Sequence, residues 1–164
     1  FFALGAILSF IALWLIIFTN KTNKLKLANT LTELTLINEK TLQVGLFMLT
    51  IGTFLGGVWA NESWGRYWGW DPKETWALVS ILVYVFVLHM RFIPPLKGKY
   101  IFNVASSVAI WSIIMTYFGV NYYLSGLHSY AAGDPMPIPA FVYYLVAITI
   151  ISAILARVKY KKYY

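Results

Sequence analysis

The chain has 164 residues, of which 60% are hydrophobic and only 12% are charged. A soluble domain carries about 25% charged residues, so this composition excludes an ordinary soluble protein, and the length predicts one bundle without a second domain. The absence of cysteine excludes disulfides, thiolate metal sites and a cysteine nucleophile on this chain. The net charge of +7 comes from basic residues grouped between apolar runs, which indicates membrane topology and no nucleic-acid partner.

Five apolar runs are each long enough to cross a bilayer core of about 30 Å as a helix. The expected spans are residues 1–18, 41–59, 74–92, 101–124 and 138–156. We therefore predict an all-α, polytopic transmembrane bundle of about five spans, in which residues 1–164 form a single unit within the lipid bilayer. The chain begins inside an apolar run, without an initiator Met or a basic leader, so we expect it to be a piece of a longer protein.

The first connection, residues 20–40, is rich in leucine and lysine. Leu25, Leu27, Leu31, Leu34 and Leu36 alternate loosely with polar residues. This pattern predicts a short amphipathic helix that lies on the membrane interface.

The connections between the spans differ in charge, and this difference indicates which side of the membrane each connection faces. Residues 20–40, residues 91–100 and the tail after residue 156 hold eleven of the thirteen basic residues and only two acids, Glu33 and Glu39. The positive-inside rule places this side in the cytoplasm, or in the stroma of a plastid. Two outer connections, residues 59–76 and 125–137, are then periplasmic in a bacterial inner membrane, or face the other side of a thylakoid membrane.

Residues 59–76 are unusually rich in tryptophan. Five of the seven tryptophans of the chain lie there: Trp59, Trp64, Trp68, Trp70 and Trp76. Tryptophan also collects at membrane interfaces without any further function, but such belts are usually scattered over several helix ends. Five indoles in eighteen residues, together with Tyr67 and two glycines, predict an ordered loop that holds a flat, apolar, partly anionic ligand such as a porphyrin.

Charged residues of this loop have two interpretations. Arg66 and Lys73 could contact the propionates of such a ligand, or they could form exposed salt bridges with Glu62, Asp71 or Glu74. Asp71 stands at a helix N-cap position, followed by Pro72 and, three residues after the cap, Glu74. This order predicts the start of the third span, and capping by Asp71 does not exclude a second role.

The two histidines of the chain are candidate iron ligands. His89 lies near the inner end of the third span and His128 in the second outer connection. About 27 Å of helix separates Asp71 from His89, so the tryptophan loop and His89 mark opposite faces of the membrane. Neutral imidazole is a common axial ligand of haem iron, although His89 could simply bond a neighbouring helix and His128 could be an ordinary loop residue.

The run Trp64-Gly65-Arg66-Tyr67-Trp68-Gly69-Trp70-Asp71 resembles the WWD signature of haem-handling proteins of cytochrome c maturation. Its continuation through Trp76 looks most like the CcsA (ResC) branch, the haem-handling subunit of a cytochrome c synthase that is sometimes fused to its partner CcsB (ResB). The resemblance extends from about the second span to the last.

This resemblance implies a specific function. Haem b would pass from the inner side to the external WWD loop and be held there, reduced, while its vinyl groups react with the thiols of an apocytochrome c CxxCH motif. His128 matches an external haem ligand and His89 an inner transmembrane one. No residue of the chain needs to be a nucleophile, since the protein ligates, orients and shields the haem.

One departure and two alternatives accompany this expectation. The family has a further external histidine before the WWD loop, and no histidine precedes His89 here. We expect that partner upstream of Phe1, on a missing portion or another chain, so lyase activity would need portions beyond this sequence. A haem-delivery protein of the CcmC type shares the motif, and a structural membrane protein with a heavy aromatic belt is the alternative without haem.

Overall fold

The structure is a computed structural model that describes residues 1–124 and 137–164. Within those two ranges every regular element is helical. The α-helices are α1 (Phe2–Ile17), α2 (Lys24–Trp64), α3 (Pro72–His89), α4 (Lys99–Ile114), α5 (Val120–Tyr123) and α6 (Ala140–Tyr163). The predicted all-α membrane bundle is confirmed.

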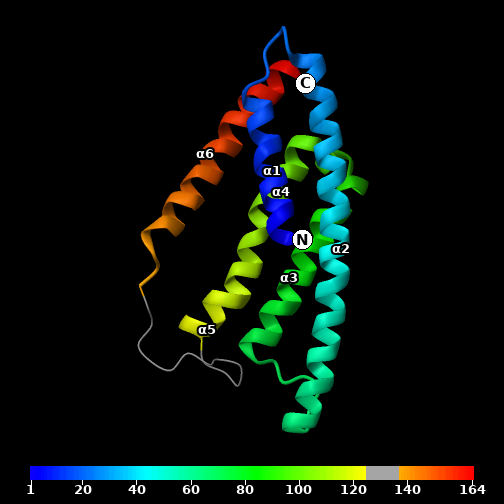
Figure 1. Cartoon of the computed structure of the whole chain (residues 1–164), viewed down its shortest axis with the longest axis vertical. Coiled ribbons are helices and arrows are strands. Elements are labelled where there is room, and N and C mark those ends of the chain that lie inside the picture. The colour runs from blue at the N-terminus through cyan, green and yellow to red at the C-terminus, as the bar shows by residue number, and fades with distance from the viewer. Residues whose placement is uncertain (125–136) are drawn as a thin grey trace.

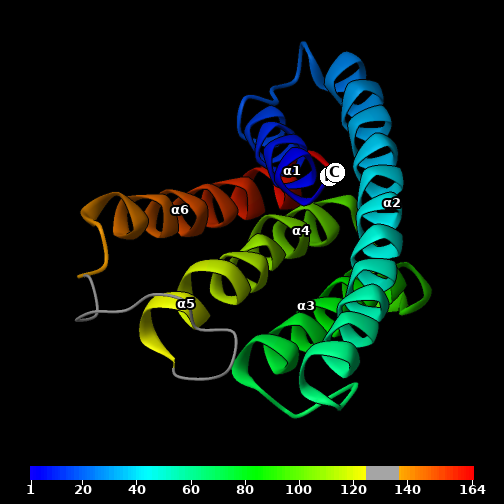
Figure 2. The same ribbon diagram turned by 60° about the horizontal axis from the view of Figure 1, so that its bottom comes forward.

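The helices lie roughly along one long axis (Figure 1). α2 follows one side of the molecule for nearly its whole length, with α1 beside its first half and α3 beside its second half. α4 crosses the middle of the bundle, and the C-terminal half of α6 packs near α1. The N-terminal half of α6 diverges from the other helices, as both views show (Figures 1 and 2). We call the end with the α1–α2 turn and the C-terminus the basic end, and the opposite end the tryptophan end.

The number of spans agrees with the sequence-based expectation of about five. Among the described residues, four helical stretches are long and apolar enough to cross a membrane: Lys24–Trp64, Pro72–Phe92, Lys99–Tyr123 and Ala140–Tyr163. α1 is a fifth apolar helix but has only 16 residues. The stretch Lys99–Tyr123 is continuous because the π-helical segment Met115–Gly119 joins α4 to α5.

The prediction of a short interfacial helix in residues 20–40 is wrong. These residues instead form the beginning of α2, a single helix of 41 residues. No glycine or proline interrupts α2 before Gly45, so nothing local ends the helix ahead of the span. Leu31 is fully buried against Leu13 and Ile16 of α1, so this part of α2 packs along a neighbouring helix.

The predicted start of α3 is confirmed. The Asp71 side chain accepts a hydrogen bond from the Lys73 backbone N–H, and Pro72 occupies the first helical turn. The Glu74 side chain completes a capping box by accepting from the Asp71 backbone N–H. The helix ends at His89 and is followed by the 3₁₀ segments Met90–Phe92 and Pro94–Leu96.

A buried polar cluster joins α1, α2 and α4. The Asn38 amide Nδ2 lies 2.7 Å from the Ser9 hydroxyl and 3.2 Å from the Ser106 hydroxyl. Asn103 donates to the Thr35 hydroxyl at 2.9 Å. Interhelical hydrogen bonds of this kind contribute about 0.6–2 kcal/mol each within a membrane, so the cluster helps to fix how the three helices pack.

Candidate functional site

The connection between α2 and α3 comprises only residues 65–71, and we call it the WWD connection. Trp59 and Trp64 lie on the last turns of α2, while Trp76 lies on α3. Gly65 ends α2 in the left-handed conformation, with φ 71°, which glycine adopts without strain. Trp70 also has a positive φ, 56°, and this conformation is strained for a bulky residue.

Glu74 ties the WWD connection to the first turn of α3. Its Oε2 accepts hydrogen bonds from the backbone N–H of Gly69 at 2.7 Å and of Asp71 at 3.3 Å. Asp71 is itself 7% exposed, and its carboxylate faces the start of α3. The helix start therefore orders the connection that precedes it.

Arg66 lies folded across Gly69. A Cβ at position 69 would overlap the Arg66 guanidinium, so only glycine accommodates this arrangement. Within the described part of the chain, Arg66 forms no ion pair with Glu62, Asp71 or Glu74, the acids considered above.

The indoles of this region are arranged in two edge-to-face pairs. Trp59 and Trp64 have ring centroids 5.1 Å apart, and those of Trp68 and Trp70 are 5.8 Å apart. Trp70 is 70% exposed, so its ring presents an apolar surface at the tip of the connection. The Nε1 of Trp68 is buried and has no hydrogen-bond partner among the described residues, which leaves it a donor for a ligand.

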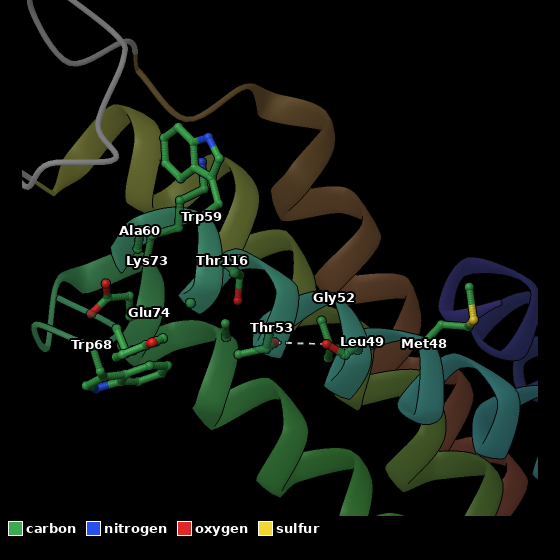
Figure 3. Close-up of a pocket in the computed structure, with 14 residues that line it drawn as sticks. Met48, Leu49, Gly52, Thr53, Trp59, Ala60, Trp68, Lys73, Glu74 and Thr116 are labelled. Carbon is green, nitrogen blue, oxygen red and sulfur yellow. Dashed lines mark hydrogen bonds between the residues drawn. The ribbon is translucent and has the colours of Figure 1, made fainter. Parts of the chain in front are cut away.

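A pocket of about 490 Å³ opens between α2, α3 and the WWD connection (Figure 3). It is lined by Met48, Leu49, Gly52, Thr53, Gly56, Gly57, Trp59, Ala60, Tyr67, Trp68, Lys73, Glu74, Ala77 and Thr116. Gly52 and Gly56 stand one turn apart on α2, and a Cβ at either would meet nothing within 4 Å. The pocket therefore has a smooth wall on α2 and aromatic rings at its tryptophan end.

Few polar groups reach this pocket. Lys73 donates to Asn121 Oδ1 of α5 at 3.2 Å, and Glu74 is held by the WWD connection. The hydroxyl of Thr116, in the π-helical segment, lies 3.1 Å from the Trp76 carbonyl oxygen and 2.9 Å from the Ser80 hydroxyl. A mostly apolar cavity of 300–1,000 Å³ with a few placed polar groups is typical of small-molecule and cofactor sites.

His89 lies at the other end of α3, about 27 Å of helix from Asp71. Its side chain is exposed, and Nδ1 donates to the Val85 carbonyl oxygen at 2.7 Å. This bond leaves Nε2 of the neutral ring with its lone pair, which is the state that binds a metal. The structure thus does not bring His89 to the pocket, and His128 lies outside the described residues.

Four of the predicted ligand-binding residues line the pocket: Trp59, Tyr67, Trp68 and Lys73. The other predicted residues of the region, Trp64, Arg66, Trp70, Asp71 and Trp76, lie around it without lining it. Sequence reasoning missed Gly52, Gly56 and Thr116. The spacing Gly52-x-x-x-Gly56-x-x-x-Ala60 was a usable signal for a smooth helix face, whereas nothing local marked Thr116.

Comparisons with known proteins agree with the motif. Residues 1–128 match the family described as Cytochrome C assembly protein. The chain is 54% identical over 137 residues to Protein NrfI of Wolinella succinogenes, covering 84% of this chain and 15% of that protein. It is 48% identical over 98 residues to the cytochrome c biogenesis protein CcsA of Synechococcus sp. (strain CC9902), covering 60% of this chain and 32% of that protein.

A third relative, CcsA of Pyropia yezoensis, is 43% identical over 102 residues, which are 62% of this chain and 32% of that protein. The chain thus spans less than a third of the length of each of these relatives. The family match covers most of the chain and includes the whole WWD connection. This chain therefore belongs to the cytochrome c assembly protein family and is a CcsA-type cytochrome c biogenesis protein.

Proposed function

We propose that this chain binds haem b in the pocket beside the WWD connection, as the haem-handling part of a cytochrome c synthase. Reduced haem is presented at the outer membrane face, where its vinyl groups form thioethers with the CxxCH thiols of apocytochrome c. A CcsB-like (ResB) subunit or fused domain completes the enzyme. Relatives named cytochrome c biogenesis protein support this assignment.

The observation that carries the proposal is the composition of the pocket wall. Gly52 and Gly56 give one flat face on α2, and Tyr67 and Trp68 add aromatic surface from the WWD connection. A planar tetrapyrrole needs flat apolar surfaces on which to lie, and glycines permit the closest approach to a helix backbone. The unpartnered Trp68 Nε1 and the Lys73 ammonium provide donors for the anionic propionates.

The histidines have separate roles in this proposal. His128, which lies outside the described residues, binds the iron of haem held at the tryptophan end, as the resemblance implies. His89 binds haem iron at the other membrane face through Nε2, because its Nδ1 is already engaged with Val85. A backbone carbonyl that fixes the second ring nitrogen is the usual companion of a metal-binding histidine.

The relatives favour the synthase over a CcmC-type delivery protein. Two CcsA proteins are 43% and 48% identical to this chain, although the WWD signature is shared by both branches. The chemistry asked of this chain is limited to binding, orienting and shielding haem, since vinyl groups and thiols supply the reactivity. Accordingly, none of its side chains is assigned as a nucleophile.

Haem occupancy of the pocket is tested by filling it. Gly56→Leu adds four carbons on the pocket wall, where a new Cβ meets no neighbour, so the helix should tolerate the change. We expect haem retention in this pocket, measured in a His89→Ala background that lacks the other proposed iron ligand, to fall about tenfold or more, equivalent to about 1.4 kcal/mol. The Soret absorbance of the purified protein and a haem titration measure this loss.

The matched control is Val58→Phe, which also adds four carbons on α2. Val58 is half exposed and does not line the pocket, so haem retention should stay near the wild-type level. Equal loss in both variants, or none in Gly56→Leu, contradicts the proposed site. A wild-type preparation that has no Soret band and takes up no haem instead favours the structural alternative.

A further inference from the structure

An apolar groove lies between α1 and α6, far from the WWD connection. Its volume is about 280 Å³, and all but one of its lining residues are apolar. The lining residues are Trp14, Ile17, Phe18, Ile148, Ile151, Ser152 and Leu155. Trp14 and Ile17 lie in the last turn of α1 and Phe18 directly follows that helix, so the groove lies near the basic end of the molecule.

The face of α6 that lines this groove continues into two lysines. Residues 148, 151, 152 and 155 follow the three- and four-residue spacing of one helix face. The same face extends through Lys159 and Lys162, which stand about 6 Å and 10 Å beyond Leu155 along the helix. Arg157 and Lys161 lie on the opposite face of the same turns.

The two lysines lie beside an aromatic ring of α6, and the end of α6 reaches the α1–α2 turn. The ammonium groups of Lys159 and Lys162 lie 5.7 Å and 5.6 Å from the centre of the Tyr163 ring. The Tyr164 hydroxyl lies 3.4 Å from the Thr19 hydroxyl, which brings the end of α6 to the α1–α2 turn. Lys21 stands in that turn, three residues after the groove residue Phe18.

We propose that this groove is a binding site for an anionic phospholipid of the bilayer. One acyl chain lies along the apolar groove, and the phosphate lies at the groove mouth among Lys21, Lys159 and Lys162. The positive charge at the end of α6 complements a phosphate, because residues 155–164 contain four basic residues and no acid. A juxtamembrane lysine contributes about 1 kcal/mol to the attraction of an anionic lipid surface.

The combination of features selects this ligand class. A soluble anion would use the lysines and leave the apolar groove in water, whereas a zwitterionic lipid would use the groove and gain little from the lysines. The positive-inside rule accounts for the number of basic residues at this end, but it does not place two of them on the groove face. An acyl chain joined to a negative headgroup matches both parts of the site.

Trp14 provides a direct probe of groove occupancy, because it lines the groove and is 40% exposed. The purified protein is reconstituted in phosphatidylcholine vesicles that contain equal mole fractions of either brominated phosphatidylglycerol or brominated phosphatidylcholine. Bromine quenches nearby indoles, and subtraction of the quenching of a Trp14→Phe variant isolates the Trp14 contribution. We expect the anionic lipid to quench Trp14 more strongly than the zwitterionic lipid.

Two double variants with the same loss of charge separate a site from general attraction. Lys159→Gln with Lys162→Gln removes the groove-face charges, and the preference for the anionic lipid should fall roughly fivefold for each lysine removed. Arg157→Gln with Lys161→Gln removes two charges from the opposite face of the same helix and should leave the preference near the wild-type value.

Three results would overturn the proposal. Equal quenching by both lipids means that only annular lipid passes the groove, and quenching by neither means that protein covers it. An equal loss of preference in the two double variants means that the lysines act through net charge alone. The four residues changed in the two double variants have exposed or half-exposed side chains on α6, so the fold should persist in both.

Discussion

Gly69 decides where the Arg66 side chain lies. Because a Cβ at position 69 would overlap the guanidinium, Gly69→Ala should displace Arg66 from the WWD connection. If Arg66 donates a charge-assisted hydrogen bond to a haem propionate, its displacement costs about 1.5–3 kcal/mol of haem binding, or more than tenfold in Kd. A haem titration followed at the Soret band measures this change.

A double variant shows whether Gly69 acts through Arg66. Arg66→Gln alone should weaken haem binding to a similar extent, and adding Gly69→Ala to it should cost little more, since neighbouring residues that act together are not additive. Additive losses would mean that Gly69 contributes through the backbone and not through Arg66.

Trp70 carries backbone strain at the tip of the same connection. Its φ of 56° belongs to the left-handed region, which a bulky side chain occupies at a cost of about 1–2 kcal/mol and which asparagine tolerates better. Trp70→Asn should therefore preserve or raise the thermal midpoint while haem retention falls. A lower midpoint together with unchanged haem retention would contradict a strained, ligand-directed Trp70.

At the scale of the element, α3 carries pocket-lining residues at its N-terminal end and His89 at its C-terminal end. Asp71 caps the helix, so Asp71→Ala should destabilise the protein by about 1 kcal/mol, whereas Asp71→Asn keeps a good capping group. The difference between the thermal midpoints of the two variants measures the loss of the capping group. Haem retention in Asp71→Asn then reports on the carboxylate charge, and a loss without destabilisation identifies a role beyond capping.

Local signals explain which elements could be predicted from the sequence. Asp71, Pro72 and Glu74 lie within four residues, so the start of α3 follows from chemistry that the chain carries at that point. The continuity of α2 depends on α1, whose buried Leu13 and Ile16 pack on Leu31. Leucine spacing at the start of α2 fits an interfacial helix equally well, and only the tertiary partner distinguishes the two.

The pocket shows the same division between local and tertiary information. Its aromatic end follows from the tryptophan-rich run, because those residues are neighbours in sequence. Another part of its lining is Thr116, which lies in the π-helical segment Met115–Gly119, distant in sequence, and contacts Trp76 and Ser80. No pattern in the sequence predicts a single π turn, so this contribution was not foreseeable.

At the scale of the whole molecule, the polar cluster around Asn38 holds three helices together. Asn38→Leu removes the bonds to Ser9 and Ser106 and should cost about 1–2 kcal/mol of unfolding free energy. The exposed Asn29 on the same helix offers a control, because Asn29→Leu should change stability by less than about 0.5 kcal/mol. Unfolding in mixed micelles compares the variants, and equal stability of the two would mean that the cluster does not fasten the bundle.

The unbroken course of α2 has a mechanical consequence. Its 41 residues span about 61 Å at 1.5 Å per residue, roughly twice the thickness of the bilayer core. A tilt of this helix by about 5° about its centre would displace each tip by roughly 2.7 Å. Such a tilt would move the glycine face near one tip and the lysine-bearing tip together, because both belong to one continuous helix.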